Sequence, residues 1–234
     1  MNKLKKLWNY LWSSFWFVPS LMFLAREHKT IVRMEHGIGD FVVQNTPLAS
    51  LAMESQPPIE LVSALQDAYI MDRHRTVYQD PAFGVRQLVD MALRAISPGI
   101  NDTTTAVMCI DYLTSILSRL ASRDIPSVYC YEGKDLLVIG MGQTLESLMA
   151  ESFDQIRASA KGNTAIMIRM LGALQIIASL TANQSRRQIV SGHVQWIEEL
   201  AERTIESSHD KEKFENRLAR LRKSLGVDNK KEQI

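Results

Sequence analysis

An uncharged run at the N-terminus constrains this chain more than any other feature. Residues Leu7 to Ala25 contain no charged side chain, and Lys3, Lys5 and Lys6 precede them. A run of about 19 residues is close to the minimum for crossing a bilayer. The run is also rich in tryptophan, which prefers the headgroup layer of a membrane. The sequence therefore predicts membrane contact, as a short or tilted span or as an interfacial anchor, and a buried helix is the third interpretation.

The composition of the whole chain excludes several classes of protein. The chain has 234 residues and a formal net charge of +1, so it lacks the basic field that attracts nucleic acid. Its two cysteines, Cys109 and Cys130, lie in apolar stretches without paired spacing, which is typical of free thiols in a reducing compartment. The histidines lack the spacing of metal ligands, and neither a P-loop nor a GxGxxG motif follows a strand. We therefore expect no metal, no cofactor and no nucleic-acid partner.

Two segments predict small β elements. From Thr30 to Ala52 the apolar residues follow a period of two, and a polar turn separates Phe41–Val43 from Leu48–Leu51. This alternation predicts two or three short strands. Between Ser127 and Gly140, arms rich in β-forming residues flank Glu132-Gly133-Lys134, a pattern typical of a β-hairpin.

Most of the remaining chain shows the 3.6-residue periodicity of amphipathic helices. We predict a mainly α fold of the α+β type, with the helical patterns over residues 58–69, 83–96, 102–121, 145–159, 164–181, 185–207 and 211–225. The predicted organisation is an N-terminal membrane segment (1–29), a small β element (30–55), a helical soluble domain with one β-hairpin (56–226) and a disordered tail (227–234).

One long stretch resembles a known family. The string QDPAFGVRQLVDMALRAISPGIND, residues 79–102, is similar nearly residue for residue to the DUF2254 family, bacterial membrane proteins of uncharacterised function. The resemblance extends through FDQIRASAKGNTAIMIRMLGAL. The string SSFWFVPSLMFLA resembles the first membrane helix of that family, and GDFVVQNTPLASL its small β element. The resemblance implies a location in the bacterial cell (inner) membrane and supplies no catalytic residue.

The chain departs from the family pattern in its membrane region. Family members carry several membrane helices before the soluble part, whereas here Ala25 leads almost directly into the β element at Thr30. The chain therefore resembles a shortened member that lacks most of the membrane region. A single short apolar segment cannot line a pore by itself, so the sequence does not favour transport or channel activity.

The string SPGINDTTTA, residues 97–106, contains the candidate site. Pro98 and Gly99 predict the end of one helix, and Asn101 or Asp102 can cap the next helix by accepting a backbone N–H. A helix N-terminus carries unpaired N–H groups and a partial positive charge, which favour anions such as phosphate or carboxylate. If nearby arginines converge there, the ligand-binding residues are Arg75, Arg86, Arg94, Asn101, Asp102 and Thr103.

The same residues also support a purely structural interpretation, which we favour. A glycine turn, an Asx cap and arginines paired with aspartates would tie two helices together, and Asp102 as the cap would itself repel an anion. The residues of this polar network are Asp80, Asp90 and His74, together with the arginines. His74 lies between two arginines and is also a candidate general base, although a histidine in a polar loop is more often only solvated.

These observations predict a membrane-associated protein that is a binding or regulatory module rather than an enzyme. Its expected partners are the membrane and either further copies of the chain or other membrane proteins. The alternative is an anion-binding sensor or an enzyme that uses the arginine cluster near the SPGIND turn. Arginines that point into a pocket without carboxylate partners would favour this alternative, and arginines paired with carboxylates would favour the binding module.

Overall fold

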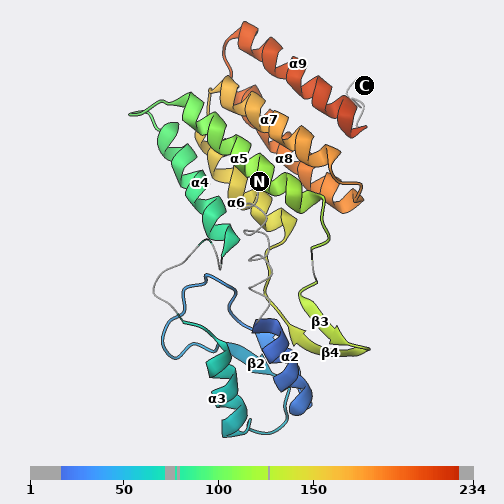
Figure 1. Ribbon diagram of the computed structural model, residues 1–234. Helices are drawn as coiled ribbons and strands as arrows, with labels where there is room; N and C mark the ends of the chain where they lie inside the picture. The colour runs from blue at the N-terminus through green and yellow to red at the C-terminus, as the bar shows by residue number, and fades with distance from the viewer. Residues whose placement is uncertain (1–16, 72–76, 78–79, 126, 227–234) are drawn as a thin grey trace, which may run out of the picture. The chain divides into compact units, whose positions relative to one another are not determined.

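The computed structural model describes residues 17–71, 77, 80–125 and 127–226. Within these residues the chain is mainly helical and has one small sheet, which confirms the predicted fold class (Figure 1). The chain divides into two units. Unit 1 falls within residues 1–84 and 126–143, and unit 2 within residues 85–125 and 144–234.

The sheet of unit 1 combines strands from two distant parts of the chain. Its order is β2-β1-β4-β3, with bounds β1 Val32–Met34, β2 Ala49–Leu51, β3 Tyr129–Glu132 and β4 Asp135–Ile139. Strands β1 and β2 are antiparallel, and so are β3 and β4, whereas β1 and β4 are parallel. The predicted hairpin is therefore present, with Gly133 in the left-handed region at its turn. It pairs with β1, although the sequence grouped it with the helical segment.

Two helices share an apolar core with this sheet. Helix α2 (Phe17–Glu27) packs against β1, β4 and helix α3 (Ile59–Ala68). Leu21 and Ala25 of α2 are fully buried in this core, so these two positions of the predicted membrane segment contact protein. The part of that segment before Phe17 lies outside the described residues. The other buried core residues are Val32, Met34, Leu61, Leu65, Leu137 and Val138.

None of the helices in the described part of the chain combines the length and the apolar character needed to cross a bilayer.

A long loop joins β1 to β2 and includes a segment that the sequence predicts as strand. Phe41–Val43 lies in this loop between two local turns and pairs with no strand of the described sheet. Gly37 N–H donates to Oδ2 of Asp40 at 2.7 Å, and the Thr46 hydroxyl donates to the carbonyl of Val43 at 2.7 Å. Such turns compete with strand pairing.

Helices make up the described part of unit 2. They are α4 (Pro81–Ala95, from Val85 on), α5 (Thr103–Ala121), α6 (Leu145–Ser159), α7 (Thr164–Ser179), α8 (Gln184–Thr204) and α9 (Ser208–Leu225). Helix α7 packs against α5, α8 and α9 (Figure 1). Its sequence is mostly apolar, as expected for a helix that packs against three others. Cys109 of α5 is buried and Cys130 of unit 1 is half-buried, and both are free thiols.

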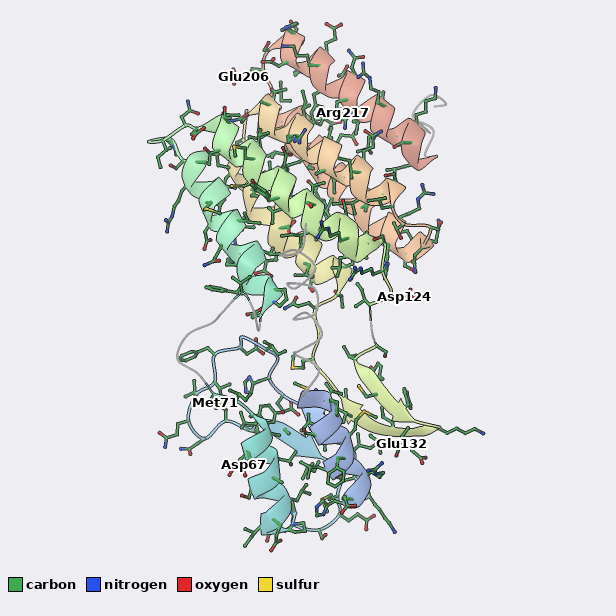
Figure 2. All side chains as sticks on the ribbon, viewed as in Figure 1. Asp67, Met71, Asp124, Glu132, Glu206 and Arg217 are labelled. Carbon is green, nitrogen blue, oxygen red and sulfur yellow. The ribbon has the colours of Figure 1, made fainter. Side chains whose placement is uncertain are left out.

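Helix α9 approaches α7 closely at a glycine. A Cβ at Gly172 would lie 3.0 Å from Nη2 of Arg217, so the missing side chain lets the guanidinium group lie against α7. Figure 2 labels Arg217 on α9, where the helix runs beside α7.

Candidate functional site

The SPGIND turn joins α4 to α5 through a tight set of backbone hydrogen bonds. The N–H of Asp102 donates to the carbonyl of Ala95 at 2.7 Å, and the N–H of Asn101 donates to Ser97 at 2.9 Å. Asn101 has a φ of 50°, in the left-handed region that asparagine tolerates better than most residues. The turn therefore places Asp102 directly before the first turn of α5.

Asp102 is the N-cap of α5, one of the two caps that the sequence allows. Its carboxylate accepts the backbone N–H of Thr105 at 3.0 Å and also accepts the Thr105 hydroxyl. The hydroxyl, followed by the backbone N–H, holds the pKa of Asp102 below its ordinary value. The positive end of α5 thus already has a carboxylate of the same chain as its partner.

Thr103 connects the starts of two helices. The side-chain amide of Asn163 donates to its hydroxyl at 3.4 Å. Asn163 also caps α7, as predicted, because its Oδ1 accepts the N–H of Ile166 at 3.2 Å. The N-termini of α5 and α7 therefore lie together, linked by polar side chains from both helices.

Arg86 pairs with a residue that the sequence did not single out. Its Nε and Nη2 each lie 3.1 Å from Oε1 of Glu151 on α6. Ala95 follows Arg86 by nine positions, which correspond to about 14 Å along a helix. Arg86 thus belongs to a contact between α4 and α6 that is separate from the SPGIND turn.

The other predicted residues that the structure describes lie on α4 or directly before it. Arg94 and Asp90 are exposed on α4. Asp80 is buried at the start of α4, where its carboxylate accepts the N–H of Phe83 at 3.2 Å. His74 and Arg75 lie outside the described residues. Asp102 and Thr103, which are neighbours in the sequence, thus lie at the start of α5, and Arg86 lies elsewhere.

A polar cluster between α6 and α8 was missed by sequence reasoning. His193 is only 3% exposed, and its ring makes edge contacts with Phe153 and Trp196. Nδ1 of His193 lies 3.8 Å from Oδ1 of Asp154, and Nη2 of Arg157 lies 4.0 Å from the same oxygen. The sequence does contain a signal for this burial. His193 lies at helical spacing between Val190 and Ile197, which belong to the buried face of α8.

The environment of His193 favours its neutral form. Burial lowers the pKa of His193, and this effect outweighs the nearby Asp154 carboxylate, which acts in the opposite direction. Ser152 of α6 is also fully buried, and its hydroxyl has no hydrogen-bond partner among the described residues. Within residues 17–71, 77, 80–125 and 127–226, no group of three or more His, Cys, Asp or Glu side chains is arranged to hold a metal ion.

Comparison with known proteins decides the family. The model of the DUF2254 family, described as a predicted membrane protein, matches residues 13–176, which is more than half of the chain. This chain belongs to the DUF2254 family. The resemblance seen in the sequence is thereby confirmed, and the DUF2254 match covers both the SPGIND turn and the Arg86–Glu151 pair.

Curated DUF2254 relatives of this chain come from mycobacteria. An uncharacterized protein of Mycobacterium bovis and two of Mycobacterium tuberculosis are each 31% identical to it over 138 residues. The matched region is 58% of this chain and 26% of each relative, so the chain spans about a quarter of the length of these proteins. No solved structure matches the chain.

Proposed function

We propose that this chain is a membrane-associated, non-enzymatic binding module that contacts protein partners through unit 2. Membrane association is supported by the description of the DUF2254 family as a predicted membrane protein. It is also supported by the uncharged, tryptophan-rich run that begins at Leu7.

The outer face of α5 carries the proposal. Met108, Tyr112 and Ile116 recur every four residues, so they lie in one stripe along the helix. They expose 50%, 58% and 37% of their surface, whereas Leu113 and Leu117 of the same helix are fully buried. Adjoining exposed apolar side chains on an otherwise packed helix are typical of a surface that binds another protein. We call Met108, Tyr112 and Ile116 the α5 stripe.

Charged side chains border the α5 stripe without interrupting it. Asp111, which precedes Tyr112, forms an ion pair with Arg169 of α7. An apolar centre with a polar rim is the usual arrangement of protein interfaces. The paired charges at this rim need no partner from outside, so the α5 stripe itself would supply most of the binding energy.

The predicted site residues that have carboxylate or hydroxyl partners support a role other than catalysis. Asp102 accepts two hydrogen bonds from Thr105, and Arg86 is neutralised by Glu151. Groups used in this way hold helices together and are less available to a substrate. This arrangement supports the binding module over the anion-binding sensor or enzyme.

Site-specific photo-crosslinking in the full chain tests the proposal. A benzoylphenylalanine residue replaces Tyr112 in cells, and a matched variant carries it at Glu202, which is exposed on α8. We expect irradiation to give a discrete adduct from position 112 and none from position 202. The adduct mass then distinguishes a second copy of the chain from another protein.

Two other results would contradict the proposal. If position 112 gives no more adduct than position 202, the α5 stripe is not a binding surface. A rise in melting temperature with inorganic phosphate, lost in the Arg94→Ala variant, would instead support the anion-binding alternative.

A further inference from the structure

We propose that the loop between β1 and β2 inserts apolar side chains into the surface of a lipid bilayer. This inference rests on the membrane association in the proposed function and names the lipid contact that unit 1 makes. The β1–β2 loop is defined here as residues 35–48, which lie between the two strands.

The β1–β2 loop exposes apolar side chains to an unusual degree. Phe41 exposes 89% of its surface, more than any other large apolar side chain in the described part of the chain. Ile38 and Val43 of the same loop are 43% and 57% exposed. Leaving three such side chains in water costs free energy that burial in an apolar phase would recover.

Hydrogen bonds within the loop keep these side chains outward. The turn at Gly37–Asp40 is closed by the Asp40 carboxylate, and the turn at Val43–Thr46 is closed by the Thr46 hydroxyl. Asn45 has a φ of 68°, which fits the second turn. Phe41 lies between these two turns, so its exposure is a property of the local backbone.

The part of the loop around Phe41 carries little charge, whereas Glu35 lies at the start of the loop beside β1. Asp40 is the charged residue within GIGDFVVQNTP, residues 37–47. Its Oδ2 already accepts the N–H of Gly37 at 2.7 Å. A carboxylate with an internal hydrogen bond loses less on leaving water than a free one. Lipid contact at Phe41 still requires the Asp40 carboxylate to stay in the hydrated headgroup layer.

The course of the chain brings this loop toward the end of unit 1 at which the predicted membrane segment enters. Lys29 has a φ of 49°, and the N–H of Thr30 donates to the carbonyl of Ala25 at 2.9 Å, so the chain reverses between α2 and β1. Strand β1 then runs back beside α2, and the loop after Met34 lies toward the end of unit 1 where α2 begins (Figure 1). The part of the predicted membrane segment that precedes Phe17 in the sequence joins α2 at that end.

Binding to vesicles tests the proposal with the full chain. The variant Phe41→Glu with Val43→Glu is compared with Ile59→Glu, since Ile59 is 83% exposed at the start of α3 in the same unit. We expect the loop variant to partition about tenfold less onto vesicles of phosphatidylcholine and phosphatidylglycerol. The Ile59→Glu variant should partition like the unchanged chain.

The outcomes separate this inference from the proposed function. If the unchanged chain binds vesicles and both variants bind equally well, the loop does not contact lipid and the membrane association stands. If the unchanged chain does not bind vesicles, the membrane association fails and this inference fails with it.

A second measurement keeps the loop apolar and so avoids any loss of folding. Tryptophan is placed at position 41 in one variant and at position 59 in the other, and brominated lipids quench tryptophan that reaches the acyl chains. We expect the added emission of Phe41→Trp to be quenched and that of Ile59→Trp to be unaffected. Equal quenching at the two positions, or no quenching at position 41, would overturn the proposal.

Discussion

Arg86 of α4 and Glu151 of α6 form an ion pair in which both Nε and Nη2 of the arginine lie 3.1 Å from Oε1 of the glutamate. The two side chains are 35% and 19% exposed, so water screens their attraction only in part. The pair joins two helices that are far apart in the sequence.

A double-mutant cycle measures this pair. We expect Arg86→Ala and Glu151→Ala each to lower the free energy of unfolding, with a coupling of about 1 kcal/mol between them. The exposed pair Arg26–Glu132 is the matched control, because both side chains are more than half exposed and their coupling should be close to zero. Urea denaturation of the two sets of variants gives both couplings, and equal values would contradict the prediction.

The hydrogen bond between Asn163 and Thr103 links α7 to α5, and we expect substitution of its two residues to lower the free energy of unfolding by different amounts. Asn163→Ala removes the cap of α7 and the hydrogen bond to Thr103, and should lower the free energy of unfolding by about 1 kcal/mol or more. Thr103→Val removes only the hydroxyl and should cost less, because Asn163 still caps its helix. Thermal denaturation compares the two, and a larger loss for Thr103→Val would show that the cap matters little.

The contact between Gly172 and Arg217 predicts that the effect of Gly172→Ala on stability depends on the side chain at position 217. Alanine is favoured over glycine within a helix by about 1 kcal/mol, but its Cβ would lie 3.0 Å from Nη2 of Arg217. We expect Gly172→Ala to stabilise the chain in the background of Arg217→Ala and to give less stabilisation, or a loss, with Arg217 present. The difference between the two backgrounds, measured by denaturation, is the test, and additive effects would contradict the close contact.

Burial of His193 predicts a stability that depends on pH. Its folded pKa is lowered from the ordinary value of 6.5, so below pH 6.5 the unfolded chain takes up a proton more readily than the folded one. The contribution of neutral His193 to the free energy of unfolding is therefore complete above pH 6.5. It falls as the pH drops toward the folded pKa of His193. The groups that act on His193 are Asp154, Arg157 and Glu146 of α6.

The comparison for this prediction is His193→Gln. This variant should lose less stability than the unchanged chain between neutral pH and pH values below 6.5, as followed by urea denaturation. His209→Gln is the matched control, because His209 is exposed on α9. If both variants keep the pH dependence of the unchanged chain, other groups are responsible for it.

Local features of this fold could be predicted from the sequence, because their signals lie within a few residues. Asn163 marks the start of α7 through the cap that it forms, and Gly133 marks the turn between β3 and β4. The helix predicted over 145–159 is α6, with the same bounds. Periodicity and capping act over one or two turns, so a single sequence contains them.

Features that depend on distant partners could not be predicted in the same way. The sequence suggested an aspartate for Arg86, and the packing of α4 on α6 supplies Glu151 instead. His193 looked isolated because Asp154 and Arg157 approach it only when α6 and α8 meet. Phe41–Val43 has the composition of a strand, but hydrogen bonds on either side of it form turns. For Arg86 and His193 the tertiary structure decides the partner, whereas at Phe41–Val43 local turns compete with the strand that the composition predicts.

The parallel pairing of β1 with β4 has a consequence for synthesis of the chain. Arg33 lies opposite Ile139, so translation must continue for roughly 100 residues after β1 before its neighbour exists. Helices α3, α4 and α5 leave the ribosome in that interval. A nascent chain that stops at Gly84 lacks Leu137 and Val138 from its core. The sheet of unit 1 is therefore completed late in synthesis, although its first strand is made early. Until β4 is synthesised, the edge of β1 is open to pairing with other chains.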